Sequence, residues 1–173
     1  MNPYDSMTRD QLLRALDMFA KNWLAHDGCW FLAAESKFGM DTAIELDTES
    51  WRKFARAEAR RIMITFAIRE KGGLPALERA LSLRMYSIIN EQHFEWSEDR
   101  RTLTFYMDVC RVQETRRAKG LADFPCKSVG KVEFDTFART IDPRIRTQCL
   151  HCPPKAPVGK YCAWQFTLEE SPA

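Results

Sequence analysis

The spacing of apolar residues changes near residue 93, and this change limits the possible folds more than any other feature. Upstream, apolar side chains recur every three or four residues, as at Leu12, Leu16 and Phe19. Downstream, residues 94–96 and 102–109 alternate between apolar and polar around a polar turn. The first spacing is typical of amphipathic helices and the second of a β-hairpin. The order predicts an α+β fold, with long N-terminal helices packed on a roughly four-stranded antiparallel sheet.

The helical half, residues 1–92, is expected to hold three long helices. Thr8 and Gln11 form a capping box, so the first helix begins there and runs for about thirty residues to Gly39, with a break near Gly28 as one option. A short helix over 41–46 follows, then a long one from Thr48 or Ser50 to residue 71. A third begins at Pro75 and reaches residue 92.

The second half, residues 93–173, adds a hairpin, a helical turn over 113–119 and a helix of about fifteen residues, with Pro125 and Cys126 at or just before its first turn. Strands over 144–150 and 161–168 complete the sheet. Because 173 residues provide one hydrophobic core rather than two, both halves are expected to form a single domain over residues 1–173.

The charge pattern argues against a nucleic-acid partner, and the absence of long apolar runs argues against a membrane span. The net charge is +2, and Lys and Arg are interleaved with Asp and Glu, so no basic stripe suited to nucleic acid is present. No run approaches the roughly 20 apolar residues that span a bilayer, and the N-terminus lacks the pattern of a secretory signal. We therefore expect a cytoplasmic protein with neither a nucleic-acid nor a membrane partner.

Five of the six cysteines lie between residues 110 and 162. In a reducing compartment, such clusters bind metal or react more often than they form structural disulfides. The pair Cys149 and Cys152 has the spacing of a zinc knuckle, and Cys162 with Cys126 or Cys110 would complete four ligands. Zinc is the expected cofactor, and an iron–sulfur cluster fits the same ligand count. The alternative is that the cysteines are small buried hydrophobic residues.

Nucleophilic catalysis is a second interpretation of the same cysteines. Cys126 is expected at a helix N-terminus, where the helix dipole favours a thiolate, and Cys162 in an apolar pocket. Either thiol would need a base, with His26 or Asp108 as candidates. Nearby arginines could hold a carboxylate or phosphate, or could form a solvated charged edge; these are Arg111, Arg139, Arg144 and Arg146.

A pocket is predicted from polar residues in apolar positions. His26 and Asp27 interrupt the apolar stripe of the first helix, and Glu58 lies near the middle of an apolar face. A buried carboxylate is costly without a partner, and His26, Asp27, Arg60 and Arg61 are candidates. Two interpretations stay open: an internal ion pair with an arginine, or one wall of a small-molecule pocket with His26 or Asp27 opposite.

Four stretches resemble an uncharacterised family of prokaryotic cytosolic proteins: residues 22–28 (NWLAHDG), 108–113 (DVCRVQ), 123–130 (DFPCKSVG) and 137–145 (FARTIDPRI). The order of helices followed by a cysteine-bearing sheet is also remotely similar to the L-2-amino-thiazoline-4-carboxylic acid hydrolase family and to the 4-vinyl reductase domain. The first similarity implies hydrolysis of a sulfur heterocycle, and the second implies a small-ligand pocket with metal-binding cysteines.

Three functions remain compatible with these observations. The first is a metal-binding domain, with zinc as the expected metal and a small-molecule pocket lined by His26, Asp27, Glu58, Arg111 and Arg139. The second is a hydrolase of small cyclic or amide-like substrates, which uses a cysteine or a metal-bound water. The third is a non-catalytic ligand sensor or scaffold. The pattern leaves open whether the chain is an enzyme, and a homodimer would fit exposed apolar helix faces.

Overall fold

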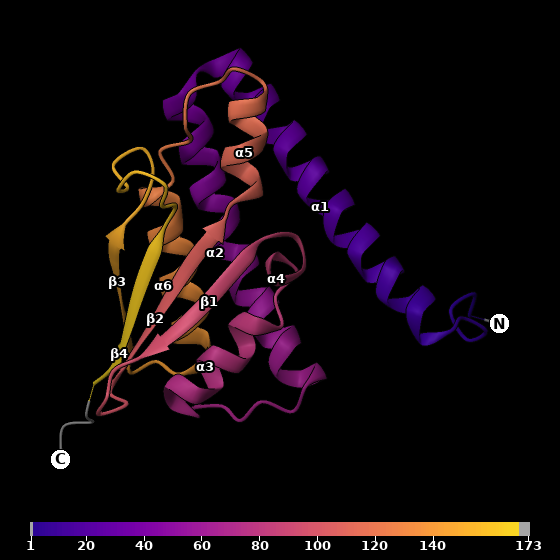
Figure 1. Cartoon of the computed structure of the whole chain (residues 1–173), viewed down its shortest axis with the longest axis vertical. Coiled ribbons are helices and arrows are strands. Elements are labelled where there is room, and N and C mark those ends of the chain that lie inside the picture. The colour runs from indigo at the N-terminus through magenta and orange to yellow at the C-terminus, as the bar shows by residue number, and fades with distance from the viewer. Residues whose placement is uncertain (1, 170–173) are drawn as a thin grey trace.

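The computed structural model describes residues 2–169, which form six helices and a four-stranded antiparallel sheet (Figure 1). The predicted α+β class is confirmed. The helices are α1 (Arg9–Phe38), α2 (Met40–Thr65), α3 (Gly73–Ser82), α4 (Tyr86–Ile89), α5 (Arg111–Ala118) and α6 (Lys127–Ile141). The strands are β1 (Glu91–Trp96), β2 (Thr102–Val109), β3 (Ile145–His151) and β4 (Ala163–Leu168).

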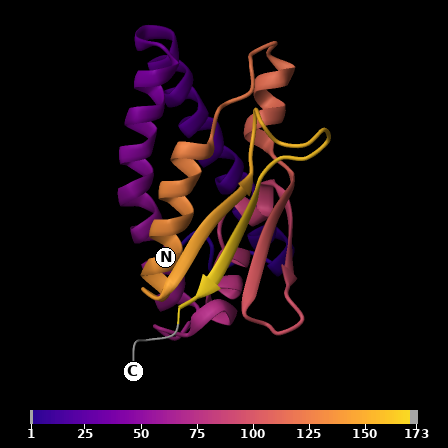
Figure 2. The same ribbon diagram turned by 90° about the vertical axis from the view of Figure 1, so that its left-hand side faces the viewer.

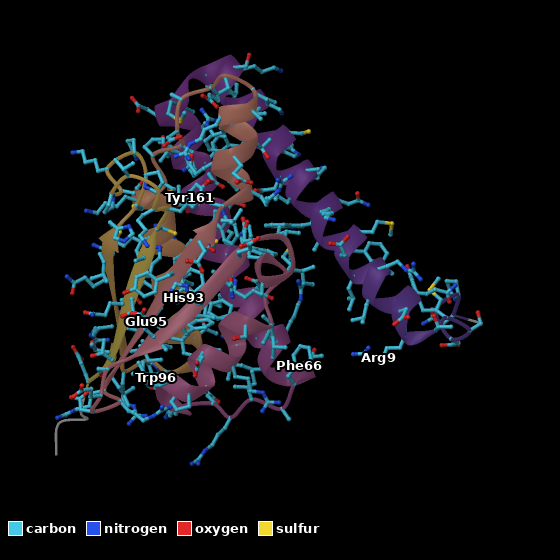
Figure 3. All side chains as sticks on the ribbon, in the orientation of Figure 1. Arg9, Phe66, His93, Glu95, Trp96 and Tyr161 are labelled. Carbon is cyan, nitrogen blue, oxygen red and sulfur yellow. The ribbon has the colours of Figure 1, made fainter. Side chains whose placement is uncertain are left out.

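The sheet has the order β1-β2-β4-β3, with every neighbouring pair antiparallel. Figure 2 shows α6 lying between the sheet and α2, so the molecule has a sheet layer and a helical layer. The covered face of the sheet carries large apolar side chains because strand residues alternate between faces: Leu103, Phe105, Trp164 and Phe166 are all buried. On the other face, which is turned to the viewer in Figure 3, His93 stacks on Tyr106.

Gly130 lets α6 approach the sheet closely. A Cβ atom at this position would lie 2.6 Å from the Trp164 ring, whereas real Cβ contacts are essentially never this short. Trp164 is 1% exposed and also stacks on Phe134, so Gly130 and Phe134 both contact this ring. A glycine inside a helix is normally unfavourable, and here it allows the contact between the helical layer and the centre of the sheet.

The first helix begins as predicted, with Thr8 and Gln11 forming the capping box, and continues to Phe38 without a break at Gly28. Its C-terminal part packs on α2, where Trp23 contacts Trp51 and Phe54. Its N-terminal part projects away from the rest of the molecule (Figure 1), leaving Leu16 54% exposed. Among the described residues, no helix is both long and apolar enough to cross a membrane.

Two helix boundaries differ from the predicted ones. Residues 40–65 form one helix, α2, and the Thr48 hydroxyl donates to the Ile44 carbonyl inside this helix instead of capping a new one. The third helix ends at Ser82, well before residue 92, and Gln92 and His93 belong to strand β1. Just after this helix ends, Arg84 turns into the core, where it meets two carboxylates.

Candidate functional site

A cavity of about 530 Å³ lies between the helical layer and the upper part of the sheet. All six helices contribute residues to its wall, together with strands β1 and β2 and the start of β4. The wall is mainly apolar and rich in aromatic rings, including those of Phe31, Trp51, Tyr86, Phe105, Phe134 and Trp164. These rings come from the apolar faces of helices and from alternate strand positions, so the cavity continues the hydrophobic core.

Three of the predicted cysteines, Cys110, Cys126 and Cys162, reach the cavity wall. Burial raises the pKa of the Cys110 thiol and raises that of Cys162 well above its usual value. Both thiols are therefore neutral near pH 7, and neither is a ready nucleophile, because the thiolate is the reactive form.

A buried arginine forms the polar part of the wall. Arg84 Nε lies 2.9 Å from Glu58 Oε2, and Arg84 Nη2 lies 2.7 Å from Glu133 Oε1. The Arg84 side chain is only 3% exposed, and its guanidinium carbon lies 4.9 Å from the centre of the Phe137 ring and 5.3 Å from that of Tyr86. Burial lowers the pKa of Arg84, but the two carboxylates outweigh this effect and hold the guanidinium charged. We call Glu58, Arg84 and Glu133 the arginine cluster.

Two further carboxyl groups, Asp27 and Asp47, line the cavity beside the arginine cluster. Burial raises the pKa of Asp47 to about 7, and the charges of Asp27 and Glu133 add to the effect. Burial also raises the pKa of Asp27 and of Glu133. One arginine thus faces more carboxyl groups than it can neutralise, so part of this wall carries protons near neutral pH.

A second group of thiols lies where β3 ends and α6 begins. The Cys149 and Cys152 sulfur atoms are 3.5 Å apart, and the Cys126 thiol lies close enough to affect the pKa of Cys152. Residues three apart would face opposite sides of a regular strand, but the irregularity between Cys149 and His151 and the end of β3 bring the two thiols together. We call Cys126, Cys149 and Cys152 the sulfur cluster.

The hydrogen bonds of the sulfur cluster converge on Cys152. Hydrogen bonds from Cys126 and Cys149 lower the pKa of Cys152 to about 6, although its burial opposes this. The pKa of Cys126 is raised, first by its bond to Cys152 and then by burial. The helix start at Cys126 is as predicted, but the thiolate expected there is favoured on Cys152 instead, because Cys126 acts as the donor.

The structure divides the predicted metal ligands between two places. Cys162 and Cys110 line the cavity, whereas Cys149 and Cys152 do not, so the five thiols separate into two groups that share Cys126. Within residues 2–169, no group of three or more His, Cys, Asp or Glu side chains is arranged to hold a metal ion. Zinc and an iron–sulfur cluster therefore stay predictions.

The predicted pocket residues are also divided. Asp27 and Arg111 line the cavity, whereas His26 is exposed and is not part of the wall. Glu58 forms the expected ion pair with an arginine, but its partner is Arg84 and none of the four candidates. Arg139 lines a separate surface hollow between α2 and α6.

The two candidate catalytic bases, Asp108 and His26, lie away from the cysteines that they were predicted to activate. Asp108 lies 2.6 Å from His93 on the exposed face of the sheet (His93 is labelled in Figure 3), and His26 is exposed on α1. Neither side chain is part of the cavity wall that holds Cys126 and Cys162.

Sequence reasoning missed Arg84, Glu133, Asp47 and Tyr86 as wall residues. One signal was available for Arg84, which lies between the apolar residues Leu83 and Met85, much as Glu58 lies within the apolar face of its helix. Two charged residues of opposite sign in apolar positions indicate a buried pair.

The arrangement of helices on one face of a four-stranded sheet occurs in known proteins. A crystal structure of trafficking protein particle complex subunit 3 from Naegleria fowleri, covalently bound to palmitic acid, matches with a TM-score of 0.50 over 94% of this chain and 98% of that chain. The two sequences are 9% identical, so the similarity concerns the fold alone.

At the level of sequence, residues 5–168 match the model of a family of unknown function, DUF6125, and the chain belongs to that family. This membership agrees with the resemblance to an uncharacterised family. No curated protein matches the chain. The similarities to the thiazoline hydrolase and 4-vinyl reductase groups receive no support from these comparisons.

Proposed function

We propose that this protein binds a small, mainly apolar molecule in the cavity between its helical layer and its sheet. The observation that carries the proposal is the cavity itself, whose volume of about 530 Å³ falls within the range of small-molecule sites. Close-packed interiors rarely contain large voids, because surrounding atoms lose dispersion contacts at an empty wall. An apolar ligand would restore those contacts.

The polar groups of the wall support binding rather than chemistry. The thiols of Cys110 and Cys162 are held neutral, because burial raises their pKa values. The arginine cluster already pairs its guanidinium with two carboxylates. We therefore favour a non-catalytic ligand-binding protein, a sensor or carrier, over a hydrolase.

The class of ligand that we propose is one with an aliphatic chain. The Naegleria fowleri protein of similar fold is covalently bound to palmitic acid. This supports the proposal that a protein of this fold can bind an aliphatic chain. In this chain, Phe31, Leu32 and Met107 provide an apolar lining, and Arg111 and Lys119 could meet a polar head group at the edge of the cavity.

A fluorescent aliphatic probe tests the proposal. Purified full-length protein is titrated with dansyl-labelled undecanoic acid, and dansyl emission is recorded on excitation of tryptophan, because Trp51 and Trp164 line the cavity. We expect saturable binding of one probe per chain with a micromolar dissociation constant.

A matched pair of variants on α1 locates the probe. Gly28 lines the cavity, and no atom lies within 4 Å of the position that a Cβ would occupy there, so Gly28→Phe should fill the cavity without a steric clash. Ala33, on the same helix, is exposed and is not part of the wall, which makes Ala33→Phe the control. Loss of binding in the first variant alone is the expected result. Unsaturable binding, or equal affinity in both variants, would contradict the proposal.

A further inference from the structure

Two thiols of the sulfur cluster lie very close together, and neither the predicted metal site nor the proposed ligand cavity explains this short distance. The sulfur atoms of Cys149 and Cys152 are 3.5 Å apart, and a disulfide bond holds its sulfur atoms at about 2.05 Å. The pair therefore has to approach by only about 1.5 Å, a movement that side-chain rotation can supply. Both cysteines are free thiols in this structure.

The backbone fixes the members of the cluster in different ways. Cys126 is the N-cap of α6, and its carbonyl accepts from the Gly130 N–H at 2.8 Å. Cys152 is 5% exposed, and its carbonyl accepts from the Lys155 N–H at 3.1 Å. Cys149 is half-buried at the end of β3, which leaves one side of the pair open to small solutes.

The order of reaction follows from the hydrogen bond between the two thiols. Cys149 donates to the Cys152 sulfur, which makes the Cys152 sulfur the more electron-rich of the pair. Cys149 lies three residues away with its sulfur atom 3.5 Å from that of Cys152, so closing the ring constrains few residues. Cys126 belongs to another element and also lines the cavity.

We propose that Cys149 and Cys152 form a peroxide-reactive dithiol that converts reversibly into a disulfide. In the first step, the Cys152 sulfur attacks one oxygen of hydrogen peroxide; the O–O bond breaks, hydroxide leaves, and Cys152 becomes a sulfenic acid. In the second step, the Cys149 sulfur attacks the Cys152 sulfur; the S–O bond breaks, and the oxygen leaves as water with the thiol proton. The two sulfur atoms lose two electrons in total, and peroxide is reduced to two waters once solvent protonates the hydroxide.

Thiol counting and mass spectrometry test the proposal on the full-length chain. Reduced protein is freed of reductant, treated with hydrogen peroxide, alkylated and digested. We expect two of the six cysteines to resist alkylation, a mass loss of two hydrogens, and a Cys149–Cys152 link within one peptide. Dithiothreitol should restore all thiols.

Two variants separate this reaction from general oxidation. Cys149→Ser should abolish the disulfide and leave a sulfenic acid on Cys152 that dimedone traps. Cys29→Ser should leave the disulfide yield unchanged, since Cys29 is exposed on α1 and does not belong to the sulfur cluster. Circular dichroism spectra confirm that each variant is folded.

Other outcomes would overturn the proposal. These are six alkylated thiols after peroxide treatment, a disulfide that uses Cys126, Cys110 or Cys29, or no dimedone adduct in Cys149→Ser. Purified protein that carries zinc and resists peroxide until a chelator is added would also overturn it, because the cluster would then be the predicted metal site.

Discussion

The arginine cluster and the sulfur cluster are two polar groups beside the same cavity, and they are built in opposite ways. The arginine cluster joins α2, the segment after α3 and α6 through full charges in the core. The sulfur cluster joins the start of α6 to the end of β3 through weak thiol interactions. Losing one charge in the first leaves another charge buried and unpaired, whereas the second can change its bonding without creating an unpaired charge. The difference suggests that the first group maintains the fold and the second is free to react.

The largest expected effect is the loss of the buried arginine. Arg84→Met removes the charge that Glu58 and Glu133 share, so both carboxylates are left in the core without a counterion. We expect the free energy of unfolding to fall by about 3–5 kcal/mol, measured by urea denaturation. Adding Glu58→Gln and Glu133→Gln to this variant should recover part of the loss. A decrease below about 1 kcal/mol would show that the cluster resembles a surface pair.

The next effect concerns the contact between α6 and the sheet. Gly130→Ala forces a methyl group against the Trp164 ring, and we expect a loss of about 1–3 kcal/mol in the free energy of unfolding. Gly28→Ala is the control, since Gly28 is also helical and has open space around its Cβ position. That control should gain about 0.5–1 kcal/mol from reduced backbone entropy in the unfolded chain. Equal effects in both variants would contradict the close approach.

A pH-dependent effect is expected from Asp47, whose pKa is raised from 3.8 to about 7 by burial. Folding favours the neutral carboxyl, so its contribution to stability is complete below pH 3.8 and is lost as the pH rises to about 7. Asp47→Asn should therefore match the wild type near pH 4 and exceed it above pH 7, by about 1–2 kcal/mol after allowance for partial exposure. Urea denaturation across this range measures the difference, and a constant offset at every pH would exclude Asp47 as the cause.

The smallest effect on stability is expected in the sulfur cluster. Cys149→Ala removes one donor to Cys152 and should change the free energy of unfolding by less than about 1 kcal/mol. The same change should raise the pKa of Cys152 from about 6, because a hydrogen bond to the charged form is lost. The pH dependence of Cys152 alkylation by iodoacetamide measures the shift. A large loss of stability with no change in this profile would remove the contrast between the two clusters.

Local signals in the sequence predicted much of the fold. The capping box at Thr8, the hairpin and the helix that begins after Cys126 depend on neighbouring residues, and each is present. Predictions failed where distant residues decide. Thr48 is a good capping residue in isolation, but inside α2 its hydroxyl bonds to the preceding turn.

In the candidate site, too, local features were predictable from the sequence, whereas contacts between distant residues were not. Chemistry alone predicted that Glu58 requires a partner, but Arg84 lies 26 residues away and only the fold brings the two together. The clustering of cysteines was visible in the sequence, whereas their separation into a cavity wall and a sulfur cluster depends on where α6 meets β3.

Cys126 belongs to both the cavity wall and the sulfur cluster, and this position has a thermodynamic consequence. If an occupied cavity changes how Cys126 bonds to Cys152, the ligand shifts the reduction potential of the neighbouring dithiol. Linkage then requires the reverse effect in equal measure: the reduced and oxidised forms differ in their affinity for the ligand by the same factor. A single sulfur atom at the start of α6 would thus couple the redox poise of the cell to the occupancy of the cavity.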